Sequence, residues 1–340
     1  MAGPLSGMAL PSRLFARLVF AVVLGLLTGA YADLFWPHPR PAPSDFTQLW
    51  EAARMLLRGE NPYALIGPGG SFDYPFPLFY PLPAVVGAMP FAWAPLRLAD
   101  ALFAGTGAAL LAWALTRRTF ANPQLLVFAS FAMMVTAQNV QWSPLLMAAA
   151  LTPSLGFLFA CKPSIGLAMI AAYPSRAGVL AAGAFALITI AVWPGWITAW
   201  LAALPSATHM AAPVTQWGGP LILLALLRWR RPEARLLVAL ACVPQTPVLY
   251  EVVPLFLLVQ TFREGTLLVV LTGLAGKVIE TVAADVADYH AWMAISGQWI
   301  VWLVYLPCTV MVLRRPNEGL TLDWLAGWRE KWRLATARAQ

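Results

Sequence analysis

Long hydrophobic runs separated by short polar turns cover most of the chain. A helix needs about 20 mostly apolar residues to cross the hydrocarbon core of a bilayer. The pattern therefore predicts an all-α, polytopic integral membrane protein with roughly ten to twelve transmembrane helices. The turns in the middle of the chain are almost uncharged, so more than one division into helices fits there. The runs lie near residues 14–36, 98–116, 120–137, 143–158, 154–173, 177–195, 217–229, 236–250, 252–262, 266–284 and 291–313.

One segment departs from this pattern, because its apolar residues recur at helical spacing on one face only. It reads PSDFTQLWEAARMLLRGENPY and covers residues 43–63. Ser44 is a suitable N-cap for this helix, and Gly59 is a suitable residue for its end. Asp45 stands in the first turn, where an acidic side chain is favoured by about 0.3–1 kcal/mol. Helix electrostatics and function are both open explanations of Asp45.

The segment 37–97, which contains this helix, is too long for an ordinary connection. Loops beyond about 12–15 residues are uncommon and often functional. Within it, residues 78–95 predict a short helix that dips into the membrane without crossing it. A later segment carries Trp193, Trp196 and Trp200 on one helical face. It predicts an interfacial anchor, with stacking on a sugar as the less favoured alternative.

Composition supports the membrane interpretation. The chain is 60% hydrophobic and 11% charged, whereas soluble domains carry about 25% charged residues. The net charge of +7 comes from Lys and Arg in short turns and not from a basic stripe, which argues against a nucleic-acid partner. The bias of these basic residues places the N- and C-termini in the cytoplasm and segment 37–97 outside.

The chain ends add two expectations. Arg13, Arg17 and the A-x-A site Ala30-Tyr31-Ala32 resemble a cleaved signal peptide, but the apolar run continues to Trp36 and favours a retained anchor. Residues 317–340 predict a basic amphipathic tail on the cytoplasmic surface, with Trp and Leu at helical spacing. We expect one transmembrane domain, residues 1–316, followed by this tail.

Polar residues inside lipid are costly, so each one is a candidate functional residue. Lys162 has no acidic residue near it in the sequence, which favours an anion site over snorkelling to the membrane surface. For the amide cluster at residues 138–141, solvation of a loop is the alternative to a functional role. Lys277 and Glu280 are expected to pair with each other. The candidates are Asp45, the amide cluster Gln138, Asn139 and Gln141, Lys162, and the group Gln245, Thr246, Tyr250 and Glu251 between two prolines.

Cysteine and histidine give no sign of a metal site. Cys161, Cys242 and Cys308 all fall in hydrophobic runs and are expected to pack in the core. The three histidines, His38, His209 and His290, do not have the spacing of zinc ligands. We expect neither a metal nor a cofactor.

Several short motifs, taken in order, resemble one family of membrane enzymes. They are Ser44-Asp45-Phe46, Gly59-Glu60-Asn61-Pro62-Tyr63, Tyr74-Pro75 through Tyr80-Pro81-Leu82, Ala137-Gln138-Asn139 and Cys161-Lys162-Pro163. The set resembles the GT-C superfamily of glycosyltransferases, and within it glycosyltransferase family 87, the group similar to polyprenyl-phosphate-mannose-dependent α-mannosyltransferases. The resemblance covers most of residues 14–260.

The resemblance implies a GT-C-like helical bundle and an inverting glycosyltransferase on the outer face of the bacterial inner membrane. The donor would be a polyprenyl-phosphate sugar, with mannose as the family-based expectation, and the acceptor a lipid or a glycan. Asp45 would be the general base on the acceptor hydroxyl. The departing phosphate needs a cation, for which Lys162 is the first candidate and Arg97 the second. Substrate contacts are expected from Asn61, Tyr63, Tyr74, Tyr80, Gln138, Asn139, Gln245, Tyr250 and Glu251.

Two alternatives stay open. Breaks in the hydrophobic runs at Lys162-Pro163 and at 244–247 also fit a transporter or lipid flippase. That function predicts polar groups throughout the bilayer depth, whereas the sequence places them on one side. An inactive scaffold of the same fold is the other alternative, because Ala137 and Glu251 depart from the family pattern.

Overall fold

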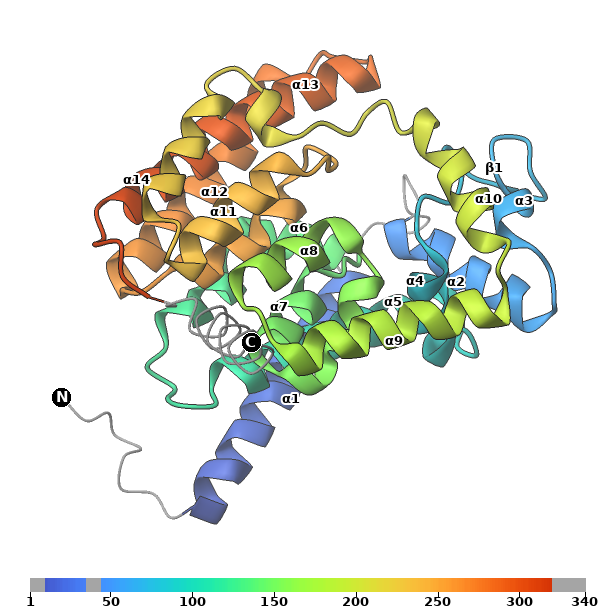
Figure 1. The fold of residues 1–340 in the computed structure, drawn as a ribbon, viewed down its shortest axis with the longest axis horizontal. Coiled ribbons are helices and arrows are strands. Elements are labelled where there is room, and N and C mark those ends of the chain that lie inside the picture. Colours follow the sequence, from blue (N-terminus) through green and yellow to red (C-terminus); the bar gives the residue numbers. More distant parts are fainter. Residues whose placement is uncertain (1–9, 35–43, 320–340) are drawn as a thin grey trace, which may run out of the picture.

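The chain folds as a bundle of helices in the computed structural model, which describes residues 10–34 and 44–319 (Figure 1). Within these described residues, four helical stretches are long and apolar enough to cross a membrane. Two further helices, α9 and α10, make a fifth if the pair, which bends by 105°, counts as one span. The long stretches are α1 (Leu10–Leu34), α5 (Leu96–Leu115), α12 (Phe262–Val282) and the run of α13 (Tyr289–Ile300), the π-helical turn η8 (Val301–Tyr305) and α14 (Leu306–Leu313); the bent pair is α9 (Arg176–Val192) and α10 (Trp196–Ala203).

The all-α prediction is confirmed, but the described residues do not supply ten to twelve full spans. The other hydrophobic runs fold into short helices, most of which have a proline at their first or second position. Proline is favoured there and prevents the preceding helix from continuing. An α-helix of 10 residues, such as α8, rises only about 15 Å, half of the hydrocarbon thickness. The short elements are α6 (Phe131–Gln138), α7 (Ser143–Leu151), α8 (Pro163–Ala172), α11 (Pro232–Cys242) and the 3₁₀ helices η2 (Pro123–Ala129), η3 (Pro153–Ala160), η6 (Gly219–Arg228) and η7 (Leu249–Leu258).

The amphipathic helix predicted after the first hydrophobic run is confirmed as α2 (Asp45–Leu57). The Ser44 hydroxyl accepts a hydrogen bond from the backbone N–H of Thr47, as an N-cap does, and Gly59 ends the helix with φ +76°. The apolar face is buried, and the ring of Phe46 stacks on Phe103 of α5 at 4.3 Å between centroids. Packing of that face fixes the start of α2, where Asp45 stands.

The rest of the first long segment folds over α2. It forms α3 (Pro62–Leu65), the strand pair β1 (Ile66–Gly67) and β2 (Phe72–Asp73), α4 (Leu82–Ala88) and the 3₁₀ turn η1 (Met89–Phe91). The short helix predicted within residues 78–95 is thus present. The tryptophan segment packs onto the same region: Trp193 contacts the ring of Tyr63 at 5.8 Å, and Trp200 donates to the carbonyl of Phe79 at 2.7 Å. The turns η4 (Leu204–Ser206) and η5 (Pro213–Thr215) follow.

Helices α1 and α5 lie side by side and antiparallel. Arg17 near the start of α1 donates to the carbonyl of Trp113 near the end of α5, and Asp33 at the other end of α1 pairs with Arg97 at the start of α5. Glycines bring the two backbones together. A Cβ atom added at Gly105 would lie 2.8 Å from the carbonyl oxygen of Gly25. Small residues of this kind allow helices to associate within a bilayer.

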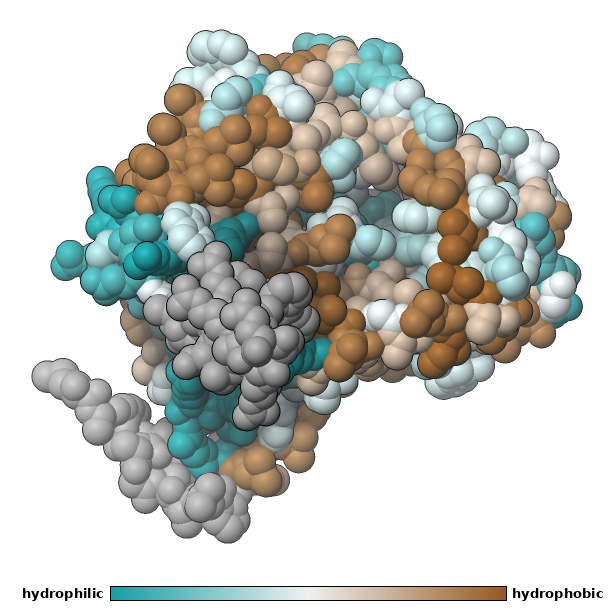
Figure 2. Space-filling model, in the orientation of Figure 1, coloured by the Kyte–Doolittle hydropathy of each residue, from teal (hydrophilic) through white to brown (hydrophobic). Residues whose placement is uncertain are grey.

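Apolar side chains cover much of the outer surface of the long helices. Figure 2 shows hydrophobic side chains over broad areas of one face, and hydrophilic ones gathered near the end of α14. Helix α9 exposes Leu180, Leu187, Ile188 and Val192, and α1 exposes Phe15, Leu26 and Leu27. Apolar surface of this extent marks a membrane or partner-facing surface. Cys161 and Cys308 are buried as expected, but the prediction for Cys242 is wrong, because its side chain is exposed at the end of α11.

Candidate active site around Asp45

Asp45 is held at the start of α2 by contacts to its capping residue. The Ser44 hydroxyl lies 3.1 Å from a carboxylate oxygen of Asp100 and 3.0 Å from the hydroxyl of Thr47. The Tyr74 hydroxyl donates to the carbonyl of Ser44 at 3.3 Å. These bonds fix the backbone on either side of the turn, so the Asp45 carboxylate points in a defined direction.

The Asp45 carboxylate belongs to a chain of buried polar groups. It accepts hydrogen bonds from the amide of Gln141 and from the hydroxyl of Tyr250, the latter at 3.2 Å. The Lys162 ammonium donates to the other end of the Gln141 amide at 3.1 Å and to Glu251 at 2.7 Å. These five polar groups come from four segments: α2, the turn before α7, the turn before α8, and η7, which supplies both Tyr250 and Glu251. The sequence-distant Glu251 is therefore the acidic partner that Lys162 lacks locally.

Backbone strain places Gln141 in this network. Val140, directly before it, has φ +53° and is the one non-glycine residue with positive φ among the described residues. A β-branched side chain disfavours this conformation, and such strain costs about 1–3 kcal/mol. The turn is held by hydrogen bonds from Val140 N–H to Ala137 and from Gln141 N–H to Thr136. Strain of this kind is characteristic of functional sites.

Asp45 lies where two cavities meet. The smaller, of about 550 Å³, is lined by Lys162, Glu251, Trp200 and His209 among others. The larger, of about 980 Å³, is lined mainly by α6, α12 and α13. Residues that line both are Asp45, Tyr74, Phe76, Thr246, Tyr250 and Tyr289. A group bound in either cavity can therefore reach the same carboxylate.

Burial changes the acid–base properties of both carboxyl groups in the network. Removal from water raises the pKa of Asp45, although Lys162 and the hydrogen bonds from Tyr250 and Gln141 act in the opposite direction. Burial also raises the pKa of Glu251 against the attraction of Lys162, and the nearby charge of Asp45 adds to the rise. A raised pKa makes an ionised carboxylate a stronger base, as general base catalysis requires.

The structure brings most of the predicted site residues to these cavities. Lys162, Tyr74 and Tyr80 line the smaller one together with Gln245, Tyr250 and Glu251, and Asn139 lines the larger. Gln245 is held by reciprocal backbone hydrogen bonds with Ala211 and by its amide, which donates to Tyr305 at 2.9 Å. These residues are far apart in the sequence and meet through the packing of short helices.

Four predicted residues do not line either cavity. Arg97 was the second candidate for the phosphate, but it forms a two-point ion pair with Asp33 at 2.8 and 3.0 Å, on the surface. Asn61 caps α3 by accepting from the N–H of Tyr63. Tyr63 donates to the carbonyl of Tyr80 at 2.9 Å, and Gln138 donates to the hydroxyl of Tyr31 at 3.0 Å. These residues position neighbouring segments of the chain.

Sequence reasoning missed an aromatic cluster in the smaller cavity. The ring of His209 lies 4.6 Å from Phe76 and 5.8 Å from Tyr289 between centroids, and Phe79 lies beside them. His209 is buried, and its Nδ1 atom makes no hydrogen bond within the described part of the chain. The three segments that supply these rings show no shared local pattern. Gln141 belongs to the amide cluster that the sequence indicated, but substrate contacts were expected only from its neighbours Gln138 and Asn139.

No metal-binding group of three or more His, Cys, Asp or Glu residues occurs in the part of the chain that the structure describes. Comparisons of the chain with models of protein families, with curated proteins and with solved structures find no match. The chemistry of the site is thus read from its own residues. It offers a proton acceptor, a buried cation, and room for a ligand on each side of the acceptor.

Proposed function

We propose that the protein is an inverting glycosyltransferase. It would transfer a sugar, with mannose as the expectation, from a polyprenyl-phosphate donor to a lipid or glycan acceptor at the outer face of the bacterial inner membrane. One observation carries the proposal: a buried carboxylate, Asp45, lies between two cavities, with the Lys162 ammonium one hydrogen-bonded residue away.

The proposed reaction needs few protein groups. Asp45 accepts the proton of the acceptor hydroxyl as the hydroxyl oxygen bonds to the anomeric carbon of the sugar. The bond from that carbon to the phosphate oxygen breaks, and its electron pair leaves with the phosphate. Lys162 stabilises the charge that develops there, where the low dielectric strengthens its effect. Attack from the side opposite the phosphate inverts the anomeric configuration.

The two cavities suit the two substrates. The smaller one offers Lys162 for a phosphate and the aromatic rings of Phe76, His209 and Tyr289 for the face of a sugar ring. The larger one has Phe131, Ile279 and Trp292 in its wall, which suits an apolar acceptor. Asp45 in the shared wall is then within reach of the acceptor hydroxyl and faces the sugar.

We infer a GT-C-like arrangement in which residues 1–316 form one catalytic domain in the membrane. Fewer helices span it fully than the sequence predicted, and short broken helices surround the site. Arg13 and Arg17 contact the end of α5, opposite the end that holds the Asp33–Arg97 pair, and Arg228 and Arg231 contact the chain just after α14. Basic residues at these ends support a cytoplasmic location for them. The predicted tail lies almost wholly in residues 320–340, outside the described residues.

Transport is the second candidate, because one observation favours it. Asp45, Lys162 and Glu251 form a buried ionisable network that lines a cavity between broken helices. Such networks carry protons or ions in transporters. Two features favour sugar transfer instead: the hydrogen bonds of the N-cap Ser44, which hold Asp45 in place, and the second, largely apolar cavity.

Reconstituted protein distinguishes the two functions. Proteoliposomes that contain the wild-type protein are supplied with polyprenyl-phosphate-mannose, radiolabelled in the sugar, and with a membrane lipid extract. Transfer predicts label on a new lipid or glycan and release of polyprenyl phosphate. Movement of intact labelled donor between leaflets without a new product would overturn the transferase proposal and support transport.

A further inference from the structure

The smaller cavity contains two carboxyl groups for one ammonium group. Among its described lining residues, Asp45 and Glu251 are the acids, and Lys162 is the lysine; no arginine lines it. With both acids ionised, the three groups together carry one negative charge. A phosphodiester donor brings another negative charge, and like charges that share a site of low dielectric disfavour each other strongly.

The hydrogen-bond donors and the charge of Lys162 are already partly used by neighbouring side chains. Its ammonium group already donates to Glu251 at 2.7 Å and to Gln141 at 3.1 Å, and the side chains of the ion pair are 13% and 5% exposed. A lysine has three donors, so one remains for a ligand oxygen. The charge of Lys162 is nevertheless balanced by Glu251, and an anion at the third donor would face the Glu251 carboxylate directly.

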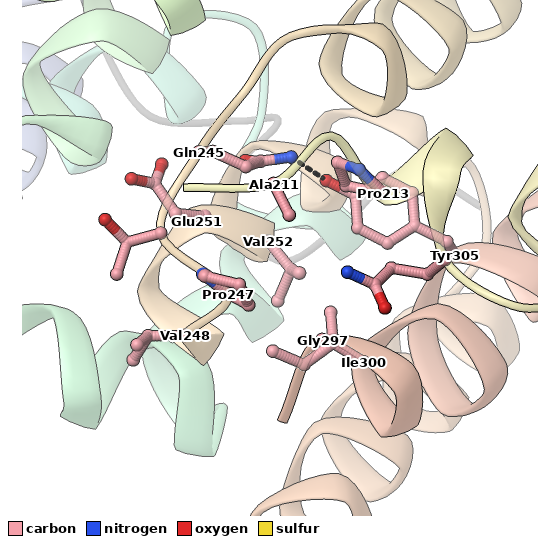
Figure 3. A pocket seen from close by; sticks show the side chains of 12 residues that line it. Ala211, Pro213, Gln245, Pro247, Val248, Glu251, Val252, Gly297, Ile300 and Tyr305 are labelled. Atoms are coloured by element: carbon pink, nitrogen blue, oxygen red, sulfur yellow. Dashed lines mark hydrogen bonds between the residues drawn. The ribbon is translucent and has the colours of Figure 1, made fainter. Parts of the chain in front are cut away.

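One oxygen of Glu251 has room for a proton. Oε1 accepts from Lys162, whereas Oε2 is buried and has no hydrogen-bond partner among the described residues. Figure 3 shows the Glu251 carboxylate pointing away from Tyr305, on the opposite side of Gln245. A buried oxygen that accepts no hydrogen bond is costly as part of a charged group. Protonated, the same oxygen becomes a hydrogen-bond donor, and rotation of the carboxyl group about its terminal bond would present it to a phosphate oxygen beside Lys162.

We propose that the donor phosphate binds beside Lys162 together with one proton, which Glu251 takes up on Oε2. This inference rests on the proposed function, because it concerns the phosphate of the same donor. The balance is simple: one phosphodiester anion and one proton from the solvent enter, and the charge of the site does not change. Glu251 then donates to the phosphate, and Lys162 is released from its ion pair to stabilise the leaving group.

The neighbours of Glu251 assign the proton to it and not to Asp45. The groups that face Glu251 or its partner Lys162 are Asp45 of α2, Gln141 and Lys162 of the turns before α7 and α8, Tyr80 of segment 37–97, Tyr305 of η8 and Tyr250 of η7 itself. Burial raises the pKa of Tyr80 and Tyr250, so both stay neutral near pH 7. Asp45 accepts two hydrogen bonds that favour its ionised form, whereas Glu251 has Lys162 alone. Burial and the charge of Asp45 also raise the pKa of Glu251.

The test measures proton uptake on donor binding. The protein in lipid nanodiscs is titrated with polyprenyl-phosphate-mannose, without an acceptor, by calorimetry in two buffers that differ in ionisation enthalpy. Above the pKa of free Glu251, we expect wild type to take up about one proton per donor, and its affinity to fall about tenfold per pH unit. Glu251→Gln should bind without uptake and with little pH dependence. Asp45→Asn should still take up the proton, because Glu251 remains on Lys162.

Several results would overturn this inference. They are donor binding to wild type without proton uptake between about pH 6 and about pH 9, unchanged uptake in Glu251→Gln, or no donor binding by folded wild type at any pH. The wild-type measurement stands alone if Glu251→Gln fails to fold. Proton-coupled binding without sugar transfer would leave this inference intact while the proposed transferase function fails.

Discussion

The α1–α5 helix pair and the Asp45 network lie within one bundle but are held together in opposite ways. At the helix pair, Gly25 and Gly105 bring backbone against backbone in the middle of the pair, and polar contacts are confined to its two ends. Around Asp45, charged and amide groups are buried beside cavities and depend on one another for hydrogen bonds. Close packing stabilises the first region. The second region lowers the free energy of unfolding, which is not expected of a region whose role is only structural.

That cost has two identifiable sources. Effective desolvation of an ion amounts to several kcal/mol, which the Lys162–Glu251 attraction offsets only in part. The backbone conformation at Val140 adds about 1–3 kcal/mol. Natural proteins tolerate such terms mainly at functional sites. The contrast therefore indicates where the function lies, and substitutions in the two regions test it.

The largest effect on stability is expected at Lys162. Lys162→Met leaves the buried Glu251 and Asp45 without a cation, and breaking a buried ion pair on one side costs about 3–5 kcal/mol. The double variant Lys162→Met with Glu251→Leu should recover most of the loss, because the ion-pair partner is removed with the lysine and Asp45 keeps its hydrogen bonds from Gln141 and Tyr250. Chemical unfolding in detergent measures both. Equal destabilisation by the single and double variants would contradict the coupling.

Gln141→Leu should impair function more than folding. The side chain joins Asp45 to Lys162, and its loss allows both groups to move. A misplacement of about 1 Å at a catalytic group lowers rates by about 10²-fold. Gln138→Leu is a matched control three residues earlier, since the Gln138 amide donates to the Tyr31 hydroxyl and not to Asp45. Sugar-transfer rates at equal amounts of folded protein decide the point; similar rates for the two variants would remove Gln141 from the site.

Gly105→Leu should destabilise the helix pair by about 1–3 kcal/mol, as overpacking does. A side chain at this position would meet the backbone of Gly25. Gly183→Leu in α9 is the control, because nothing lies within 4 Å of a Cβ atom added there. Thermal unfolding should separate the two variants clearly. Equal melting temperatures would show that the close approach of α1 and α5 contributes little.

The smallest effect is expected at the predicted Lys277–Glu280 pair, which the structure confirms at 3.0 Å with both side chains more than 70% exposed. Exposed pairs of this kind contribute less than about 1 kcal/mol. Lys277→Ala should change the free energy of unfolding by no more than about 0.5 kcal/mol. A loss as large as that of Lys162→Met, measured by denaturant titration, would mean that surface charge matters as much here as the buried network.

Local signals in the sequence predicted local structure well. The apolar face of α2, its Ser44 cap and its Gly59 end were all predicted, because each depends on neighbouring residues. The number of spans was predicted wrongly: roughly ten to twelve were expected, and the described residues contain four or five. Hydropathy records that a run such as 143–158 is apolar but not that Pro153 divides it into α7 and η3.

Partners that are distant along the chain were beyond sequence reasoning. Lys162 looked unpaired because Glu251 stands 89 positions later, and their meeting depends on the packing of α7 against both η7 and α8. Arg97 looked available because its partner Asp33 is 64 positions earlier. The sequence showed which polar residues were candidates, because they stand out in hydrophobic runs. It did not show which residues they pair with.

The proposed base gives the most direct test of the central claim. The rate of sugar transfer from polyprenyl-phosphate-mannose is measured for wild type, Asp45→Asn and the surface variant Arg97→Ala, at equal amounts of folded protein. The account predicts that Asp45→Asn loses about 10²–10⁴-fold in rate while Arg97→Ala stays near wild type. Full transfer by a correctly folded Asp45→Asn protein would contradict it.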